Sequence, residues 1–218
     1  MKPLILAGGK GNRLGGKKAT VLLLEKPLIY WVFQKLKNFS SPVYISVKNK
    51  IQEDEIKREL IKEKIKIDEM VFIRDLYPEI EGPLCGIISA LKLFPEKEAF
   101  LVVAVDQPLI NKSFLEYLST LSYIFCNQFL IVCKGEGKIR PFPGVYPCSL
   151  KEEIENFLLT SPKRSLFRLF QYLNANQKIL FIKKDDKIGY ENFININTPE
   201  ELKRVELCFS QKLKTHKM

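Results

Sequence analysis

Residues 4–18 read LILAGGKGNRLGGKK, and this stretch decides how the rest of the chain is organised. It begins with a short apolar run and continues into a loop that holds five glycines and four cations. An apolar run that stops at Gly8-Gly9 is typical of a buried strand. Glycine lets the backbone approach a ligand, successive N–H groups in such a loop bind anions, and Lys and Arg add positive charge. The stretch therefore predicts a strand followed by a phosphate-binding loop, in preference to a basic surface turn.

Two common phosphate-loop patterns match this stretch only in part. The dinucleotide pattern G-x-G-x-x-G, started at Gly9, needs a third glycine where the chain has Leu14. The Walker A pattern fits residues 11–17 but needs Ser or Thr at the position of Lys18. A Walker loop also leads straight into a helix, whereas Lys18 is followed by a second apolar run, residues 19–24. A P-loop-type NTPase stays open as an alternative of a different class.

Length and composition indicate one globular domain, predicted to span residues 1–209, with a basic C-terminal tail at 210–218. The 218 residues are 46% hydrophobic, which is enough for a large core. No apolar run is long enough for a membrane span, and the first strand begins without the layout of a signal peptide. The five cysteines are an odd number and form no C-x-x-C pair, which favours a cytoplasmic protein without disulfides or zinc.

The chain is strongly basic, with a net charge of +10, but its lysines are scattered and do not form one arm. Nucleic-acid binding is therefore not favoured. A thermophile-like composition rich in Lys, Ile and Glu, and a basic cleft for a multiply phosphorylated small molecule, are the other two interpretations of the charge.

Hydrophobic periodicity predicts alternating strands and helices along most of the chain. Further strands are expected at 43–47, 71–73, 99–105, 129–133 and 179–182, with 129–133 paired to 143–146. Helices are expected at 28–39 (with Pro27 as the first helical residue), within 48–66, and at 82–93, 111–121, 149–159 and 164–173. Thr198 and Glu201 form a capping-box pattern before a last helix. This alternation predicts an α/β fold: a doubly wound, mainly parallel sheet with helices on both faces.

Three of the predicted strands end at residues that could contact a ligand: Gly8, Asp75 and Asp106. Ligands of such sheets bind beyond the carboxyl ends of the strands, so these residues are expected in one crevice. A carboxylate at Asp106 suits Mg²⁺, although a strand-end Asp that only caps the next turn remains open for both acids. Arg13 and Lys18 are the candidates for stabilising charge on a transferring phosphate. The only histidine is in the terminal segment, which argues against a His-based mechanism.

Several motifs, in chain order, resemble the nucleotidyltransferase superfamily and, within it, the molybdenum cofactor guanylyltransferases. The superfamily likeness rests on Leu6-Ala7-Gly8-Gly9, Arg13-Leu14-Gly15, Lys18 and Lys26-Pro27-Leu28. The narrower likeness adds Gly15-Gly16, Gly82-Pro83-Leu84-x-Gly86, Val105-Asp106-x-Pro108 and Asn195-Ile196-Asn197-Thr198-Pro199-Glu200.

The resemblance implies a Rossmann-like nucleotidyltransferase fold and transfer of GMP from GTP to molybdopterin phosphate, with release of pyrophosphate. It implies Mg²⁺ on Asp106, catalytic roles for Arg13, Lys18 and Asp106, and Asn195 and Asn197 on the pterin side. The nucleotide would contact residues from four segments: Leu6, Ala7, Gly8, Gly9, Lys18, Asp75 and Asp106. Proteins of molybdenum insertion and molybdoenzyme maturation are the implied protein partners.

The chain departs from this family at two places in the predicted site. Lys17-Lys18 stands where the family has Asp-Lys, so either lysine could be the functional one, and Lys18 is preferred. Ser46-Val47-Lys48-Asn49 stands where the family often has Asn near the base. A cytidylyltransferase on molybdopterin or another phosphorylated acceptor therefore remains open beside the guanylyltransferase.

Overall fold

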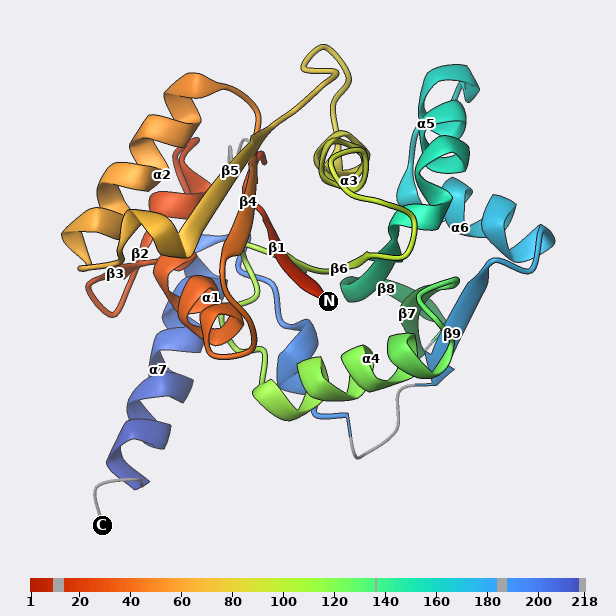
Figure 1. Cartoon of the computed structure of the whole chain (residues 1–218). Helices are drawn as coiled ribbons and strands as arrows, with labels where there is room; N and C mark the ends of the chain where they lie inside the picture. Colours follow the sequence, from red (N-terminus) through yellow and green to blue (C-terminus); the bar gives the residue numbers. More distant parts are fainter. Residues whose placement is uncertain (10–13, 136, 184–187, 216–218) are drawn as a thin grey trace.

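A seven-stranded sheet forms the centre of the computed structural model of the chain (Figure 1). The structure describes residues 1–9, 14–135, 137–183 and 188–215. The strand order is β5-β4-β1-β6-β8-β7-β9, and only β8 runs antiparallel to its neighbours. The strands are β1 (Lys2–Leu6), β4 (Val43–Val47), β5 (Met70–Arg74), β6 (Ala99–Ala104), β7 (Leu130–Gly135), β8 (Lys138–Pro147) and β9 (Ile179–Lys183). The predicted mainly parallel α/β sheet is confirmed.

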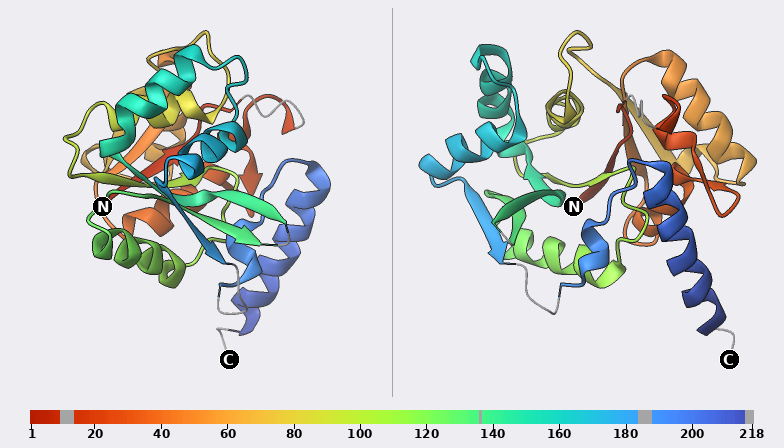
Figure 2. Two further views of the ribbon diagram at one scale, coloured as in Figure 1. Left: turned by 90° about the vertical axis from the view of Figure 1, so that its right-hand side faces the viewer. Right: turned by 180° about the vertical axis from the view of Figure 1, so that it is seen from behind.

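Helices cover both faces of this sheet, as predicted (Figures 1 and 2). One face packs against α1 (Leu28–Lys37), α2 (Lys50–Lys62) and α4 (Lys112–Ile124). The other face packs against α3 (Pro83–Leu91), α5 (Lys151–Thr160) and α6 (Leu166–Ala175). No helix within the described ranges is both long and apolar enough to cross a membrane.

The apolar run in β6 explains why the sheet has a core on each side. Leu101 and Val103 point into the core under α1 and α4, whereas Phe100 and Val102 point into the core under α3. All four side chains are fully buried, as expected of a strand that is covered on both faces. Because β1 pairs with both β4 and β6 in parallel, Leu6 lies opposite Ser46 and Ala104, and the carboxyl ends of these strands meet at one edge.

A small hairpin and the last helix pack together beside the main sheet. The hairpin is formed by β2 (Leu22–Leu23) and β3 (Lys26–Pro27), and the helix is α7 (Pro199–Thr215). Leu23 and Leu28 form a third apolar cluster with Ile196 and Val205. This cluster fixes the C-terminal segment next to the loop that follows β1.

Local sequence signals explain several element boundaries. The Asn111 side chain accepts a hydrogen bond from the Phe114 N–H at the start of α4, as predicted for a cap. The capping box is confirmed, because Thr198 Oγ1 accepts from the Glu201 N–H and the Glu201 carboxylate accepts from the Thr198 N–H. Pro27 lies at the end of β3 and caps α1, one position before the predicted place.

Most of the remaining boundaries agree with the prediction to within three residues, but β8 begins five residues before the predicted segment 143–146. β7 and β8 pair as the expected hairpin. Helix α7 continues to residue 215, so it includes part of the stretch predicted as a basic tail.

Candidate functional site

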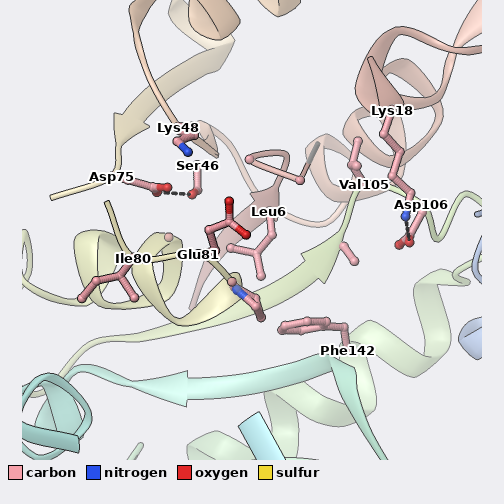
Figure 3. A pocket seen from close by; sticks show the side chains of 16 residues that line it. Leu6, Lys18, Ser46, Lys48, Asp75, Ile80, Glu81, Val105, Asp106 and Phe142 are labelled. Carbon is pink, nitrogen blue, oxygen red and sulfur yellow. Dashed lines mark hydrogen bonds and ion pairs between the residues drawn. The ribbon is translucent and has the colours of Figure 1, made fainter. Parts of the chain in front are cut away.

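A pocket of about 450 Å³ lies at the edge of the sheet where β1, β4, β5 and β6 end (Figure 3). Residues from well-separated segments line it: Leu6, Gly8, Gly9, Lys18, Ser46, Lys48, Asp75, Ile80, Glu81, Gly82, Pro83, Gly86, Ala104, Val105, Asp106 and Phe142. Figure 3 shows Lys18 and Asp106 at one end and Ser46, Lys48 and Asp75 at the other, with Leu6 between them. The predicted meeting of Gly8, Asp75 and Asp106 in one crevice is confirmed.

The backbone that follows β1 lines the pocket. The Ala7 N–H donates to the Ser46 carbonyl over 3.0 Å, which continues the β1–β4 pairing into the loop. Gly8 and Gly9 follow and line the pocket. A Cβ at Gly9 would meet no heavy atom of the described residues within 4 Å. The predicted catalytic residue Arg13 lies outside the described residues.

Gln52 joins the ends of β1 and β4, a role that the sequence analysis missed. Its Nε2 donates to the Ala7 carbonyl over 2.8 Å, and its Oε1 accepts from the Lys48 N–H over 2.7 Å. The Asn49 side chain caps the same helix by accepting from the Gln52 N–H. The only available sequence signal was the position of Gln52 in the first turn of a helix that begins at the site.

Lys18 connects the phosphate-loop segment with two distant parts of the chain. Its ammonium group donates to Asp106 Oδ2 and, over 2.6 Å, to Asn197 Oδ1. The side chains of Lys18 and Asp106 are 14% and 10% exposed, so this is a nearly buried ion pair. Lys17 instead pairs with Glu55, and its side chain is 70% exposed. The structure therefore places Lys18, and not Lys17, in the pocket.

Asp106 has a second carboxylate oxygen that is available for a ligand. Oδ1 is buried and has no hydrogen-bond partner among the described residues. The backbone carbonyl of Asp106 accepts from the Ile196 N–H over 2.9 Å, which fixes the residue against the C-terminal segment. A buried carboxylate oxygen without a partner is costly, and a cation would remove that cost. Asp106 thus fits a divalent cation held by one protein carboxylate and by substrate oxygens, since the described residues contain no cluster of three or more acidic, His or Cys ligands.

The other end of the pocket contains Asp75, Ser46 and Lys48. Burial raises the pKa of the Asp75 carboxyl to about 6, while the Ser46 hydroxyl and the Lys48 charge oppose the shift. Ser46 Oγ donates to Asp75 Oδ1 over 3.5 Å, a long hydrogen bond. This end therefore offers a carboxyl group, a hydroxyl group and an ammonium group to a polar, uncharged ligand such as a nucleobase or a sugar.

Helix α3 lies against this end because Gly86 has no side chain. A Cβ on Gly86 would come 2.2 Å from Ser46 Oγ and 3.2 Å from Leu6 Cδ2. Gly82 precedes the helix with a φ of +116°, which a residue with a side chain rarely adopts. The two glycines of the Gly82-Pro83-Leu84-x-Gly86 motif thus have separate structural reasons: one for the turn and one for close packing.

Gln107 links two strands at the site. The sequence analysis missed this residue. Its Oε1 accepts from the Ala104 N–H and its Nε2 donates to the Phe142 carbonyl, which connects β6 to β8.

The two predicted pterin-side residues have different surroundings. Asn195 is exposed, whereas Asn197 contacts Lys18. A smaller cavity of about 190 Å³ adjoins the pocket between the glycine loop and α2.

This chain is similar in sequence to known nucleotidyltransferases. The profile of the MobA-like NTP transferase domain matches residues 3–177. A probable molybdenum cofactor guanylyltransferase of Methanocaldococcus jannaschii is 34% identical over 204 residues, which cover 91% of this chain and 95% of that protein. A probable molybdenum cofactor guanylyltransferase of Clostridium perfringens is 29% identical over 199 residues, 90% of this chain and 91% of that one.

A solved structure resembles this chain in both fold and sequence. The crystal structure of molybdopterin-guanine dinucleotide biosynthesis protein A from Archaeoglobus fulgidus superposes with a TM-score of 0.74 at 27% identity. The superposition covers 97% of this chain and 100% of the other.

Proposed function

The chain belongs to the MobA-like NTP transferase domain family, and from this premise we propose that it is a molybdenum cofactor guanylyltransferase. The enzyme transfers GMP from GTP to the terminal phosphate of molybdopterin. An oxygen of the pterin phosphate forms a bond to the α-phosphorus of GTP. The bond from that phosphorus to the bridging oxygen breaks, and pyrophosphate leaves with the electron pair. The product is the guanine dinucleotide form of the cofactor.

The observation that carries this proposal is the pairing of Lys18 and Asp106 beside the glycine loop in one pocket. Nucleotidyl transfer needs positioning and electrostatic stabilisation more than covalent help from the protein. The backbone of Leu6, Ala7, Gly8 and Gly9 would border the nucleotide. The Lys18 ammonium would stabilise negative charge on the phosphates, and Asp75 would bind a polar group at the base and ribose end.

Asp106 would hold Mg²⁺, because its buried Oδ1 lacks a protein partner. When bound, the ion would neutralise charge on the phosphate oxygens of the nucleotide. Asn195 and Asn197 lie just before α7, beside the Lys18–Asp106 pair, and would face the pterin of the acceptor. Arg13 remains proposed as a second cation for the phosphates.

Two alternatives can be separated from this function. A cytidylyltransferase would use the same fold and the same residues but a different base. A P-loop NTPase would need a helix directly after the loop, whereas Lys18 begins a single 3-10 turn that leads to β2. The change Lys18→Ser completes the Walker pattern, so it should raise nucleotide hydrolysis in a P-loop protein and abolish transfer in a nucleotidyltransferase.

The cellular setting follows from the same proposal. We place the enzyme in the cytoplasm, where proteins of molybdenum insertion and molybdoenzyme maturation would supply the acceptor and receive the product. No two cysteines form a disulfide within the part of the chain that the structure describes. Nucleic acid is not expected as a partner, and a nucleic-acid binder would lose polymer affinity steeply as salt rises.

The test is pyrophosphate release from each of the four NTPs, with and without molybdopterin and with and without Mg²⁺. Release that needs GTP, molybdopterin and Mg²⁺ together is the expected result. Release that prefers CTP would overturn the base assignment and keep the reaction class. Orthophosphate release without any pterin would overturn the transferase proposal.

A further inference from the structure

The Lys18 ammonium is held by two partners of different charge. Asp106 is a carboxylate and Asn197 is a neutral amide, and the Lys18 Nζ donates one hydrogen bond to each. An ammonium group has three donors, so one N–H remains for a ligand. Lys18 lines both the main pocket and the adjoining smaller cavity, so that donor lies beside the space where a phosphate could bind.

The two partners would behave differently once a ligand is bound. A cation on Asp106 Oδ1 would draw on the negative charge of the carboxylate and so weaken its attraction for Lys18, whereas the hydrogen bond to the neutral Asn197 amide does not depend on that charge. Asn197 can therefore keep the ammonium in place without neutralising its charge. A carboxylate in the same position would hold Lys18 as firmly but would cancel the charge that a phosphate needs.

Asn197 is itself fixed by the start of α7. Its backbone N–H donates to Glu201 Oε2 over 2.7 Å, and the preceding Ile196 is fully buried against the third apolar cluster. The Ile196 N–H also donates to the Asp106 carbonyl. The amide oxygen is thus held at a defined place relative to both members of the ion pair.

We propose that Asn197 is a positioning residue for Lys18, which orients the ammonium toward the phosphates of the bound nucleotide. The segment before α7 then serves the nucleotide half of the reaction, and not the acceptor half alone. This inference rests on the proposed function only in taking a nucleoside triphosphate as the ligand of the pocket.

The test measures nucleotide binding in the absence of any acceptor, by calorimetric titration with Mg²⁺ and GTP. Asn197→Ala should weaken binding about tenfold, because the ammonium loses a hydrogen bond that orients it. Asn197→Asp has the same shape and should weaken binding further, because it adds a negative charge beside Lys18. A residue that acts only on the acceptor predicts unchanged nucleotide affinity in both variants.

Two controls separate positioning from general damage. Asn174→Asp, at an exposed position on α6, makes the same change in net charge and should leave nucleotide affinity unchanged. In a Lys18→Met background, Asn197→Ala should have no further effect on affinity, since the group that it positions is gone. Equal losses with and without Lys18 would overturn the inference.

The wild-type titration separates this inference from the proposed function. If the wild type prefers another NTP, the variants are titrated with that nucleotide, and only the base assignment has failed. If the wild type binds nucleotide and both Asn197 variants bind it equally well, the inference fails and the proposed function stands. If none of the four NTPs binds, both fail.

Discussion

Lys18 and Asp106 form an ion pair at one end of the pocket, although 88 positions separate them in the sequence. The pair joins the end of the phosphate-loop segment to the turn after β6. It places one cation and one anion at the same end of the nucleotide pocket. Lys17 does not line this pocket: it pairs with Glu55 and lines the smaller cavity beside α2.

Lys18→Met is therefore expected to lower kcat/KM for the transfer by about 100-fold or more, since it removes charge stabilisation of the phosphates. Lys17→Met is the matched control on the adjacent residue. It should change kcat/KM by no more than about fivefold, because its partner Glu55 forms an exposed ion pair with it. Steady-state kinetics of pyrophosphate release measures both. Equal losses from the two changes would contradict the assignment of Lys18.

Asp106→Asn should abolish the dependence of nucleotide binding on Mg²⁺. The amide keeps the shape of the side chain but is a much poorer ligand for a hard cation. We expect activity to fall about 100-fold or more and added Mg²⁺ to cause no recovery. Calorimetric titration of the nucleotide with and without Mg²⁺ is the measurement. A variant that still binds nucleotide more tightly with Mg²⁺ would show that the ion is held elsewhere.

The raised pKa of Asp75 predicts a pH-dependent activity. The carboxyl titrates at about 6 in the free protein because it is buried. If the charged form binds the nucleotide, kcat/KM for GTP should fall as the pH drops below 6. Asp75→Asn should remove this dependence and give a low, flat profile over the same range. A wild-type profile that is flat down to pH 5 would contradict the role of the Asp75 charge.

The same carboxyl gives an independent check through stability. Its pKa is higher in the folded protein than its usual value of 3.8, so the folded state binds more protons between these two values. The contribution of Asp75 to the free energy of unfolding therefore decreases as the pH rises from 3.8 to 6. Asp75→Asn should raise Tm relative to the wild type at pH 7.5, and the difference should disappear below pH 4.

Gly86→Ala should destabilise the protein by about 1–3 kcal/mol through overpacking. The new Cβ would lie 2.2 Å from Ser46 Oγ, so α3 or β4 must move. Ser46→Gly removes that clash, and the double variant should recover part of the lost stability in urea unfolding. If the losses of stability from the two single changes simply add in the double variant, then the backbone, and not the Ser46 side chain, limits the space beside residue 86.

Gln52→Glu should raise the KM for GTP, because the carboxylate no longer donates to the Ala7 carbonyl and repels it. Loss of one partner of a buried hydrogen bond costs about 1–3 kcal/mol, which is enough to move the glycine loop. Gln34→Glu, on α1 and away from the pocket, is the control for the added charge. An unchanged KM in Gln52→Glu would mean that the loop holds its position without this bond.

The sequence alone determined the class of fold and most of the pocket. The continuous apolar run at 99–105 reflects a strand that is buried on both faces, and the helical spacing of apolar residues in 28–39 reflects a helix that is buried on one face. Both patterns can be recognised from residues that are close together in the sequence. Gly8, Asp75 and Asp106 were placed together because parallel strands end at the same edge of a sheet. The motifs around them identified the family.

Tertiary structure decided which polar groups meet. Lys17 and Lys18 are adjacent and chemically identical, and only the path of the chain turns one toward Asp106 and the other toward Glu55. Asn195 and Asn197 likewise differ only in the direction that each side chain takes. Contacts such as Gln52 with Ala7 span 45 positions and depend on how a helix packs on the sheet. No local pattern contains that information, because the energy of such contacts arises only after the core has fixed the distance between the partners.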